Sequence, residues 1–331
     1  MINGKYVLEK AKREDLGQIA ILFSKCFGVA GTEKFFQWKY FENPAGEAFC
    51  LLVKHKSNIV GSYVMIPEDF SVFGKPKKIY KGCDLMVLPE HRSWGMASSL
   101  ISGLTERLSD SGPLFLHVIS LKATAALLLR HNWKKIDSIC RYFKASILMN
   151  IKFISKNTES LYRDGVLREI SSVKELMSIR SFKDNASRIR IIKSQEYLQW
   201  RLSDTRYSYR ITGYFKNGCL RGSIICNTGI GEADYLIDLD LADSDKEAAT
   251  ILLDAAYYQS SQSGRKLIIA ITNLSSTLNS HLISNGYLRN PFQFGPLPDE
   301  IGLYALIDNA HGSQCLNKNN WDIYPDSYDG I

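Results

Sequence analysis

The chain has 331 residues, of which 45% are hydrophobic and 23% charged, as in a globular protein with ample core. No apolar run approaches the roughly 20 residues needed to span a bilayer. The charged N-terminal stretch lacks the apolar core of a signal peptide, so we expect a cytoplasmic protein with no membrane partner. The net charge of +7 is modest and no basic run is interleaved with aromatic residues, so nucleic acid is not an expected partner.

The cysteines are scattered, odd in number and never spaced as C-x-x-C. This pattern predicts reduced thiols and neither a disulfide framework nor a metal site. They are Cys26, Cys50, Cys83, Cys140, Cys219, Cys226 and Cys315.

In chain order, the first half begins with a short strand at 6–8, after which Asp15 is expected to cap an amphipathic helix that runs to Phe27. A loop or short helix rich in aromatic residues follows and ends at Asn43-Pro44. The remaining elements expected in this half are strands over 49–55 and 59–66, a run into 85–88, a helix over 95–108, a strand over 114–119, a helix over 123–130 and a strand over 136–145.

The second half repeats short motifs of the first half in the same order. Phe36-Gln37-Trp38-Lys39 returns as Leu198-Gln199-Trp200-Arg201, and Ile59-Val60-Gly61-Ser62 returns as Leu220-Arg221-Gly222-Ser223. Further matches link 110–112 with 262–264 and 132–133 with 286–287. Two copies of one domain are therefore predicted, with strands of the second copy near 209–215, 222–227 and 235–241. We expect an N-terminal domain over 1–150, a C-terminal domain over 151–310 and a tail over 311–331.

A short turn, Arg92-Ser93-Trp94-Gly95-Met96-Ala97, joins an apolar strand to an amphipathic helix. The start of a helix carries unpaired N–H donors and partial positive charge, so it can bind an anion. Gly95 lets the backbone approach a ligand closely, and Arg92 adds a guanidinium for phosphate oxygens. The turn is therefore either a phosphate-binding site, in which Ser98 is a further donor, or an ordinary connection from strand to helix.

The spacing Val87-x-Pro89-x-x-Arg92-x-x-Gly95-x-Ala97, with Asn132-Trp133 after the last helix, resembles the GCN5-related N-acetyltransferase (GNAT) superfamily. The resemblance implies an α/β protein of two tandem domains, each a mixed, splayed, mainly antiparallel sheet flanked by helices. It also implies acyl-CoA as co-substrate and no metal. The residues implied to bind the CoA are Val87, Leu88, Arg92, Ser93, Trp94, Gly95, Met96, Ala97 and Ser98. A backbone N–H of the 85–87 stretch, centred on Met86, would polarise the thioester carbonyl.

The order Trp38-Lys39-Tyr40-x-x-Asn43-Pro44, together with the late Trp321-Asp322, resembles a narrower group of tandem acyltransferases. Its members modify nucleotide-linked amino sugars for surface polysaccharides such as lipopolysaccharide or O-antigen. This resemblance implies transfer of an acetyl or 3-hydroxyacyl group to a deoxyamino sugar that is linked to dTDP. Trp38, Tyr40 and Asn43 would then either contact the acceptor or pack onto the core. The tail over 321–329 either is disordered or folds back over the acceptor.

Amine acylation needs a neutral amine, a polarised thioester and a proton for the departing thiolate. Asp84 either accepts the amine proton, directly or through water, or is a polar residue of the strand. His117 is either a similar base or a structural histidine. Leu128 stands where many family members place a tyrosine acid, so solvent or another tyrosine such as Tyr63 would protonate the thiolate. No cysteine has a base beside it, so the amine is expected to attack the thioester directly, without an acyl-enzyme.

The second copy departs from the first at the turn. Ser244, Asp245 and Glu247 stand where the first copy has Arg92, Ser93 and Gly95. Like charges at close range cost about 1–4 kcal/mol near a surface, so this degenerate copy is expected not to bind CoA. It would instead help build the acceptor pocket or an interface.

Two other functions remain open. The missing tyrosine favours a non-catalytic sensor of acyl-CoA or nucleotide. Aminoacyl transfer to a cell-wall peptide is disfavoured by the intact turn. The sequence leaves the oligomeric state open.

Overall fold

The computed structural model describes residues 5–92, 94–110, 112, 115–145, 165–180, 187–290, 301–308 and 312–324. The chain forms two compact units, each assembled from two separate stretches of sequence. Unit 1 comprises Met1–Asp137 and Glu300–Asn320, and unit 2 comprises Ser138–Asp299 and Trp321–Ile331. The predicted domain boundaries at 150 and 310 lie outside the described residues and stay a prediction.

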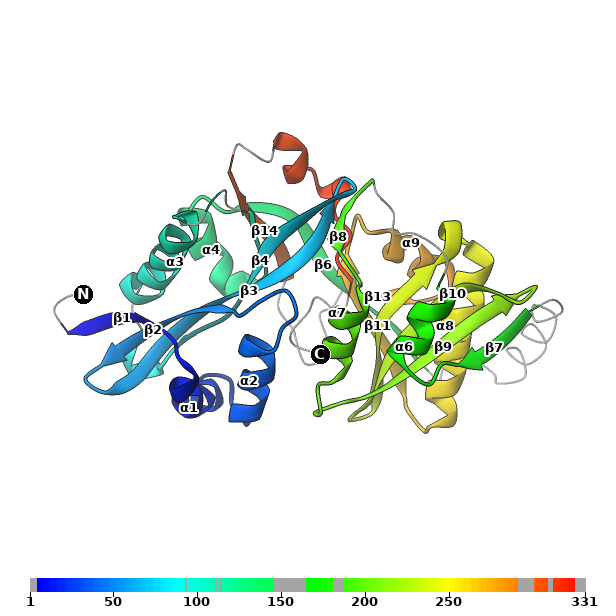
Figure 1. Ribbon diagram of the computed structural model, residues 1–331, viewed down its shortest axis with the longest axis horizontal. Helices are drawn as coiled ribbons and strands as arrows, with labels where there is room; N and C mark the ends of the chain where they lie inside the picture. Colours follow the sequence, from blue (N-terminus) through cyan, green and yellow to red (C-terminus); the bar gives the residue numbers. More distant parts are fainter. Residues whose placement is uncertain are drawn as a thin grey trace. The chain divides into compact units, whose positions relative to one another are not determined.

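Unit 1 is a mixed sheet with helices on both faces. Its elements are β1 (Tyr6–Lys10), α1 (Leu16–Phe27), α2 (Glu33–Phe41), β2 (Phe49–His55), β3 (Asn58–Val72), β4 (Lys75–Val87), α3 (Trp94–Ser109), β5 (Phe115–Leu121), α4 (Lys122–Arg130) and β14 (Ile301–Ile307). The strands lie in the order β1-β2-β3-β4-β5-β14, and every neighbouring pair is antiparallel except β4 and β5. Figure 1 shows α1 and α2 on one side of this sheet and α3 and α4 on the other.

Unit 2 repeats this arrangement. Its elements are β6 (Lys134–Ala145), which enters from unit 1, β7 (Gly165–Glu169), α6 (Val173–Ile179), β8 (Ile189–Ile191), α7 (Gln195–Leu202), β9 (Ser208–Lys216), β10 (Cys219–Ile230), β11 (Ala233–Leu241), α8 (Lys246–Gln262), β12 (Leu267–Asn273), α9 (Thr277–Ser284) and β13 (Leu288–Arg289). The main strand order is β6-β12-β11-β10-β9-β7, in which only β11 and β12 run parallel. Helix α8 packs on β9, β10, β11 and β12.

Apart from the short strand β8, which lies between α6 and α7, the order strand, two helices, three strands, helix, strand, helix therefore occurs twice among the described elements. The last strand of each repeat is exchanged. β6 follows α4 in the chain but pairs with β12 of unit 2, whereas β14 comes after unit 2 in the chain but pairs with β5 of unit 1. The predicted fold class is confirmed, and the exchange of the closing strands is a feature that the sequence did not indicate.

Gly61 and Gly222, which are one of the matches that revealed the repeat, are required for the same structural reason in both units. Gly61 on β3 lies opposite Val87, and a Cβ there would lie 3.1 Å from the Met86 carbonyl oxygen. Gly222 on β10 lies opposite Leu241, and a Cβ there would lie 2.9 Å from the Asp240 carbonyl oxygen. Each glycine thus permits a close approach of the next strand, just before that strand ends.

Most predicted elements appear within a few residues of the expected bounds, with two local differences. Asp15 does not cap α1, because its carboxylate accepts the Lys12 N–H at 2.9 Å and pairs with Lys54 at 3.1 Å. The strand expected over 59–66 continues as β3 to Val72, since it pairs with β4 as far as Lys75. The aromatic stretch before Asn43 is helix α2, whose N-cap Thr32 accepts the Phe35 N–H at 3.2 Å.

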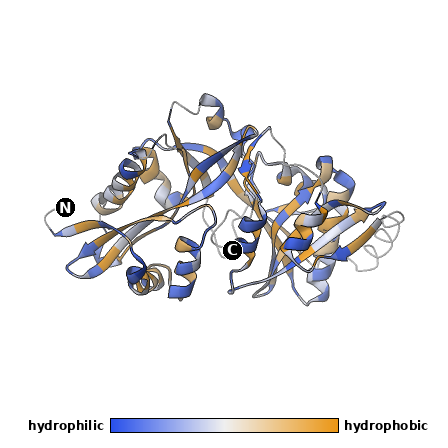
Figure 2. Cartoon of the chain, viewed as in Figure 1, coloured by the Kyte–Doolittle hydropathy of each residue, from blue (hydrophilic) through white to orange (hydrophobic). Residues whose placement is uncertain are grey.

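Each unit has its own apolar core, and Figure 2 shows hydrophobic residues recurring along the strands of both. Trp133, which follows α4, is buried in the core of unit 1. Trp321 is fully buried in unit 2, so the described part of the tail is folded back, while 325–331 lie outside the described residues.

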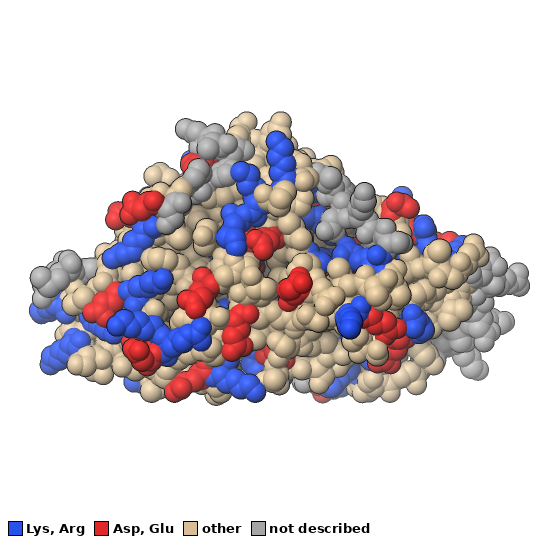
Figure 3. Space-filling view, in the orientation of Figure 1, with Lys and Arg blue, Asp and Glu red and all other residues tan. Residues whose placement is uncertain are grey.

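On the face drawn in Figure 3, Lys and Arg side chains are interspersed with Asp and Glu side chains. No helix in the described ranges combines the length and apolar character needed to cross a membrane.

Replacing Gly61 by Ala is expected to lower the free energy of unfolding by about 1–3 kcal/mol, because the new methyl group presses on the Met86 carbonyl. Gly17→Ala is the matched control, since its Cβ meets only the flexible end of Glu33 and Ala favours a helix by up to about 1 kcal/mol. Urea denaturation measures both, and equal effects of the two substitutions would contradict the packing argument.

Candidate active site

The sheet of unit 1 opens between β4 and β5. The two strands pair in parallel only over Tyr80–Gly82 and Leu116–Val118. Beyond this ladder β4 runs on to Val87, while β5 continues to Leu121 beside β14. The later part of β4 therefore has an edge that β5 does not cover, as the predicted splayed sheet requires. An uncovered strand edge offers backbone donors and acceptors to a ligand.

A β-bulge lies where the strands separate. Between the pairs Val64–Cys83 and Ser62–Met86, β4 has one residue more than β3. Asp84 adopts a left-handed backbone with φ of 50°, which is uncommon for a residue other than glycine. The Ser62 hydroxyl donates to the Asp84 carbonyl at 3.2 Å and holds this conformation. The bulge re-aims the strand toward the open edge.

Val87 presents its backbone to the open side. The Leu88 N–H donates to the Val60 carbonyl at 2.9 Å, so Leu88 and, two residues earlier, Met86 face β3. Val87 between them directs its N–H and C=O away from β3. Its carbonyl accepts a 3.1 Å hydrogen bond from Nε of Arg92. The geometry therefore favours Val87 over the predicted Met86, which is buried, as the backbone donor for a thioester.

The turn after β4 leads directly to the start of α3. A 3-10 turn over Pro89–His91 ends at Arg92, which is exposed. Ser93 lies outside the described residues, and of Trp94 only the backbone is described. Gly95 is exposed in the first turn of α3, and that turn contains no acidic residue. The start of a helix carries partial positive charge, which suits an anion.

The other residues predicted to bind CoA serve the core or the neighbouring helix. Met96 and Leu88 are buried in the core of unit 1, and Ala97 packs against it. Ser98 is hydrogen-bonded to Nε2 of His131 at 2.7 Å, so its hydroxyl ties α3 to the end of α4. Burial lowers the pKa of His131, which favours the neutral ring in this contact.

Cys26 of α1 is a neighbour of the turn that the sequence did not reveal. Burial raises the pKa of its thiol, although the Arg92 guanidinium and the Val87 N–H oppose this. The thiol therefore remains protonated at neutral pH and is a packing partner of the open edge.

Asp84 is held by two residues of α2. Its Oδ2 accepts from Nζ of Lys39 at 2.8 Å and from the Tyr40 hydroxyl at 2.7 Å. The side chains of Lys39 and Asp84 are only 4% and 8% exposed. Burial and the adjacent Asp84 charge raise the pKa of Tyr40 well above its ordinary value, so the phenol stays protonated and donates. Lys39 was missed as a site residue, although it stands within the quoted Trp38-Lys39-Tyr40 motif.

His117 belongs to a different buried cluster. Its Nε2 lies 2.9 Å from Oε2 of Glu68, whose other oxygen pairs with Lys81 at 3.1 Å. Although burial opposes its charge, Lys81 and His117 lower the pKa of Glu68. These contacts support a structural role for His117, the alternative that the sequence left open.

Among the predicted acceptor residues, only Tyr40 touches Asp84 in the described contacts. Trp38 stacks on Phe35 with ring centroids 5.9 Å apart. Asn43 donates to the Pro67 carbonyl at 2.8 Å and accepts the Ala45 N–H at 3.0 Å, so both ends of its amide serve the backbone. Tyr63 is 2% exposed and its hydroxyl lies against Gly82, where β4 and β5 separate. Leu128, in the place of the expected tyrosine, is buried in the core.

The same turn in unit 2 is closed by its own side chain. A 3-10 turn over Ala242–Ser244 is followed by Asp245, just as the turn over Pro89–His91 is followed by Arg92. Asp245 is therefore the residue that corresponds to Arg92, one position later than the Ser244 that the sequence comparison had matched. The Asp245 carboxylate accepts the Ala248 N–H at 3.0 Å, caps α8, and pairs with Arg221 at 2.9 Å. Although burial opposes it, these partners lower the pKa of Asp245, so the anion position at this helix is filled by a carboxylate.

Comparison with known proteins identifies the first half. Residues 8–126 match the family model of the acetyltransferase (GNAT) domain. This stretch is therefore similar to a GNAT acetyltransferase domain. The predicted enzyme class, a CoA-dependent N-acyltransferase, is thereby confirmed. No curated protein sequence matches the chain significantly.

Several solved structures share the fold over nearly the whole chain. A probable N-acyltransferase from Enterococcus faecalis V583 is 12% identical with a TM-score of 0.63, covering 91% of this chain and 72% of that one. A tandem GNAT protein of the clavulanic acid biosynthesis pathway is 11% identical with a TM-score of 0.64, covering 92% and 98%. Saccharomyces cerevisiae N-myristoyltransferase with bound myristoyl-CoA is 13% identical with a TM-score of 0.60, covering 92% and 81%. At these identities the likeness shows the fold alone.

The GNAT family uses acyl-CoA, and the open edge of β4 with the adjoining start of α3 fits a thioester and its pyrophosphate. In the described part of the chain, no group of three or more His, Cys, Asp or Glu residues is placed to hold a metal ion.

Asp84→Asn is expected to lower the free energy of unfolding by about 3–5 kcal/mol, because it removes the negative charge that lies 2.8 Å from the buried Lys39 ammonium. The double variant Lys39→Met, Asp84→Asn should recover much of this loss. The control Glu232→Gln breaks an exposed pair with Lys266 and should cost no more than about 1 kcal/mol. Chemical denaturation measures all three, and a single-variant cost as small as the control's would refute the buried pair.

Glu68→Gln tests the second cluster through pH. Because the folded-state pKa of Glu68 is lowered from 4.5, its stabilising contribution is present above pH 4.5 and is lost as the pH falls through the folded-state value. The stability difference between wild type and Glu68→Gln should therefore persist above pH 4.5 and shrink below it. The exposed Glu47→Gln serves as control, and a difference that grows in acid would disprove the assignment.

Proposed function

We propose that this protein transfers an acyl group from acyl-CoA, bound in unit 1, to the amino group of a nucleotide-linked deoxyamino sugar. The observation that carries the CoA site is the open edge of β4 at Val87, which leads directly to the start of α3, whose first turn has no acidic residue. The pantetheine would lie along this edge, and the pyrophosphate would accept from the first N–H groups of the helix. Arg92 is exposed, so its guanidinium would turn from the Val87 carbonyl to the phosphates.

We place one CoA site in the chain. In unit 2, Asp245 already accepts the N–H groups at the start of α8, and Glu247 in its first turn pairs with Lys216. A pyrophosphate there would meet the carboxylates of Asp245 and Glu247, where unit 1 has Arg92 and no acidic residue in the first turn of the helix. Repulsion of about 1–4 kcal/mol for each close pair of like charges opposes binding.

The proposed reaction is a direct attack. The neutral amine adds to the thioester carbon, whose oxygen gains charge stabilised by the Val87 N–H. The tetrahedral intermediate then expels the CoA thiolate and leaves the amide. Asp84 would receive the amine proton through water, since its Oδ2 is already held by Lys39 and Tyr40. Solvent would protonate the thiolate, because Leu128 carries no acid.

The acceptor class rests on the resemblance of the Trp38-Lys39-Tyr40-x-x-Asn43-Pro44 segment to enzymes of surface-polysaccharide pathways. Within this proposal the acceptor is a dTDP-linked amino sugar, the donor carries an acetyl or 3-hydroxyacyl group, and the reaction occurs in the cytoplasm. Trp38 lies in the middle of α2 and is partly exposed, whereas Tyr40 and Asn43 are buried, so it is the aromatic residue of this segment best placed to meet a sugar or base.

A second candidate is a non-catalytic sensor of acyl-CoA. The burial of Leu128 in the position of the expected acid is the observation that favours it. Release of CoA thiol from acetyl-CoA, measured with a panel of amines and dTDP-amino sugars, separates the two. Tight CoA binding without turnover on any acceptor would favour the sensor.

Gly95→Glu is expected to abolish CoA binding, because it places a carboxylate at the start of α3 where the pyrophosphate is proposed to lie. Gly95 is exposed, so the melting temperature should remain unchanged. The matched control is Glu247→Gln in the corresponding turn of unit 2, which should bind CoA like the wild type. Isothermal titration with CoA measures both, and unchanged affinity of Gly95→Glu would refute the site.

Steady-state kinetics test the direct attack. Double-reciprocal plots of initial rate, with acetyl-CoA and acceptor both varied, should give intersecting lines. Acetyl-CoA alone should leave no acetyl group on the protein in a mass spectrum. Parallel lines with a labelled protein would establish an acyl-enzyme instead.

A further inference from the structure

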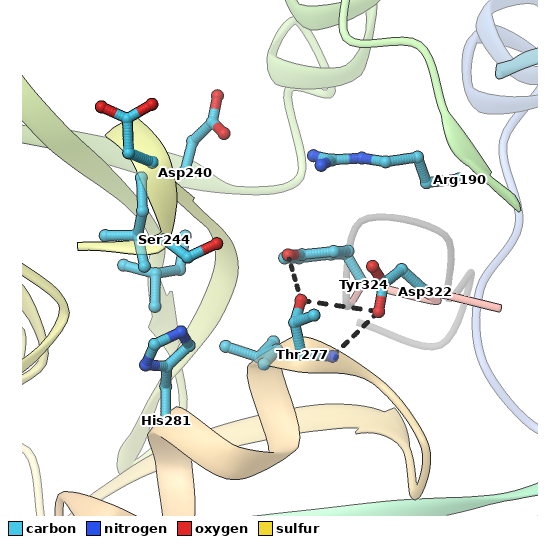
Figure 4. A pocket seen from close by; sticks show the side chains of 11 residues that line it. Arg190, Asp240, Ser244, Thr277, His281, Asp322 and Tyr324 are labelled. Carbon is cyan, nitrogen blue, oxygen red and sulfur yellow. Dashed lines mark hydrogen bonds between the residues drawn. The ribbon is translucent and has the colours of Figure 1, made fainter. Parts of the chain in front are cut away.

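Unit 2 contains a cavity of about 250 Å³ at the counterpart of the CoA site (Figure 4). β11 and β12 pair in parallel only over Ala233–Tyr235 and Leu267–Ile269, and β11 then runs on to Leu241. The cavity lies beyond this point. It is lined by the end of β11, the following turn with Ser244, the first turns of α9, Arg190, and Asp322 and Tyr324 of the tail. The second copy has therefore kept an opening in its sheet while it lost the anion position beside it.

The tail forms one wall of the cavity and is firmly held. The Asn273 amide donates to the Trp321 carbonyl at 3.1 Å, and the Thr272 hydroxyl donates to the Ile323 carbonyl at 2.7 Å. The tail thus binds to the end of β12 from which β11 has separated. Asp322 between them is 2% exposed.

One oxygen of the Asp322 carboxylate is unused. Oδ1 accepts from the Thr277 N–H at 2.9 Å and from Arg188 at 3.1 Å. Oδ2 is buried and has no hydrogen-bond partner among the described residues. Such an oxygen normally costs several kcal/mol, so it indicates a donor that completes the site. Figure 4 shows Asp322, Thr277 and the Tyr324 hydroxyl joined by hydrogen bonds at this wall.

The opposite wall is also acidic. Asp240 is 9% exposed and pairs with Arg180 at 2.6 Å, and Asp243 stands in the adjoining turn. Three carboxylates and the Arg190 guanidinium therefore line the space, together with the hydroxyls of Ser244 and Thr277. This lining favours a positively charged, hydroxyl-bearing molecule over an anion.

We propose that this cavity binds a small organic molecule with a primary ammonium group, which donates to Oδ2 of Asp322. The ligand's hydroxyl groups would form hydrogen bonds with the hydroxyl groups of Ser244, Thr277 and Tyr324. The volume fits a molecule the size of a single amino sugar and is too small for CoA. A metal ion is disfavoured, because no group of three or more suitable ligands occurs in the described residues of either unit. The site lies wholly within unit 2, so it stands independently of acyl transfer in unit 1.

Isothermal titration in the absence of CoA tests the site with matched probes. Glucosamine or ethanolamine should bind once per chain, whereas glucose, N-acetylglucosamine and ethylene glycol, which lack the ammonium, should not. Asp322→Asn should weaken binding at least tenfold, because it removes the negative charge of the carboxylate and either replaces Oδ2 with an amide group or leaves a neutral oxygen in its place. Glu232→Gln, an exposed acid of unit 2 outside the cavity, should bind like the wild type.

A second variant guards against misfolding of Asp322→Asn. His281→Trp fills the cavity from α9 without touching the carboxylate, and it should also abolish binding while the melting temperature is retained. Gly95→Glu should leave amine binding intact, which separates this site from the CoA site. The proposal is overturned if neither amine binds, if the uncharged probes bind equally well, or if binding survives in a folded Asp322→Asn or His281→Trp protein.

Discussion

A buried lysine–aspartate pair beside the bulge of the splayed strand is the interaction on which the opening of each sheet depends. In unit 1, Lys39 holds Asp84 at 2.8 Å, and in unit 2 Lys193 holds Asp238, with both side chains nearly inaccessible. Asp84 is one of two β4 residues that lie opposite Tyr63 in the bulge, and Asp238 pairs with Ile225 next to the extra residue of β11, Ile237. A carboxylate buried at such a point is tolerable only with a counter-charge, and the left-handed backbone of Asp84 must be held against its own strain. The pair thus fixes the place at which each sheet opens.

Both sheets have this opening, but the groups that line it differ between the two units. Unit 1 places a helix start without acidic residues beside the open edge, which suits the phosphate that we propose to bind there. Unit 2 caps the corresponding helix with Asp245 and lays the tail on the end of β12, which leaves an acidic cavity. The two turns also differ in their backbone, because Asp243 and Ser244 have positive φ angles of 47° and 56°, whereas Pro89–His91 have none.

The sequence revealed those parts of the site that depend on local chemistry. The strand, turn and helix around Val87 and Gly95 follow from periodicity and turn residues, and Gly61 and Gly222 revealed the repeat because each has the same steric cause. Contacts between distant segments left no such signal. The Lys39–Asp84 pair joins residues 45 apart, Asn43 proved to bond to the backbone of β3, and Asp15 bonded to Lys12 in place of the helix that follows it. The exchange of β6 and β14 depends on which sheet edge each strand meets, which no local pattern encodes.

The exchanged strands also make each unit incomplete without the other half of the chain. β5, which forms the far side of the opening in unit 1, is covered on its outer edge only when Ile301–Ile307 pairs with it. β12 likewise receives β6 from the end of the first repeat. An exposed edge of seven residues on either strand would be a site for wrong pairing. The exchange therefore couples the folding of the two units, so that the opening in unit 1 acquires its complete wall only after β14 has been made. This coupling gives a physical reason for the second copy to persist whether or not it binds a ligand.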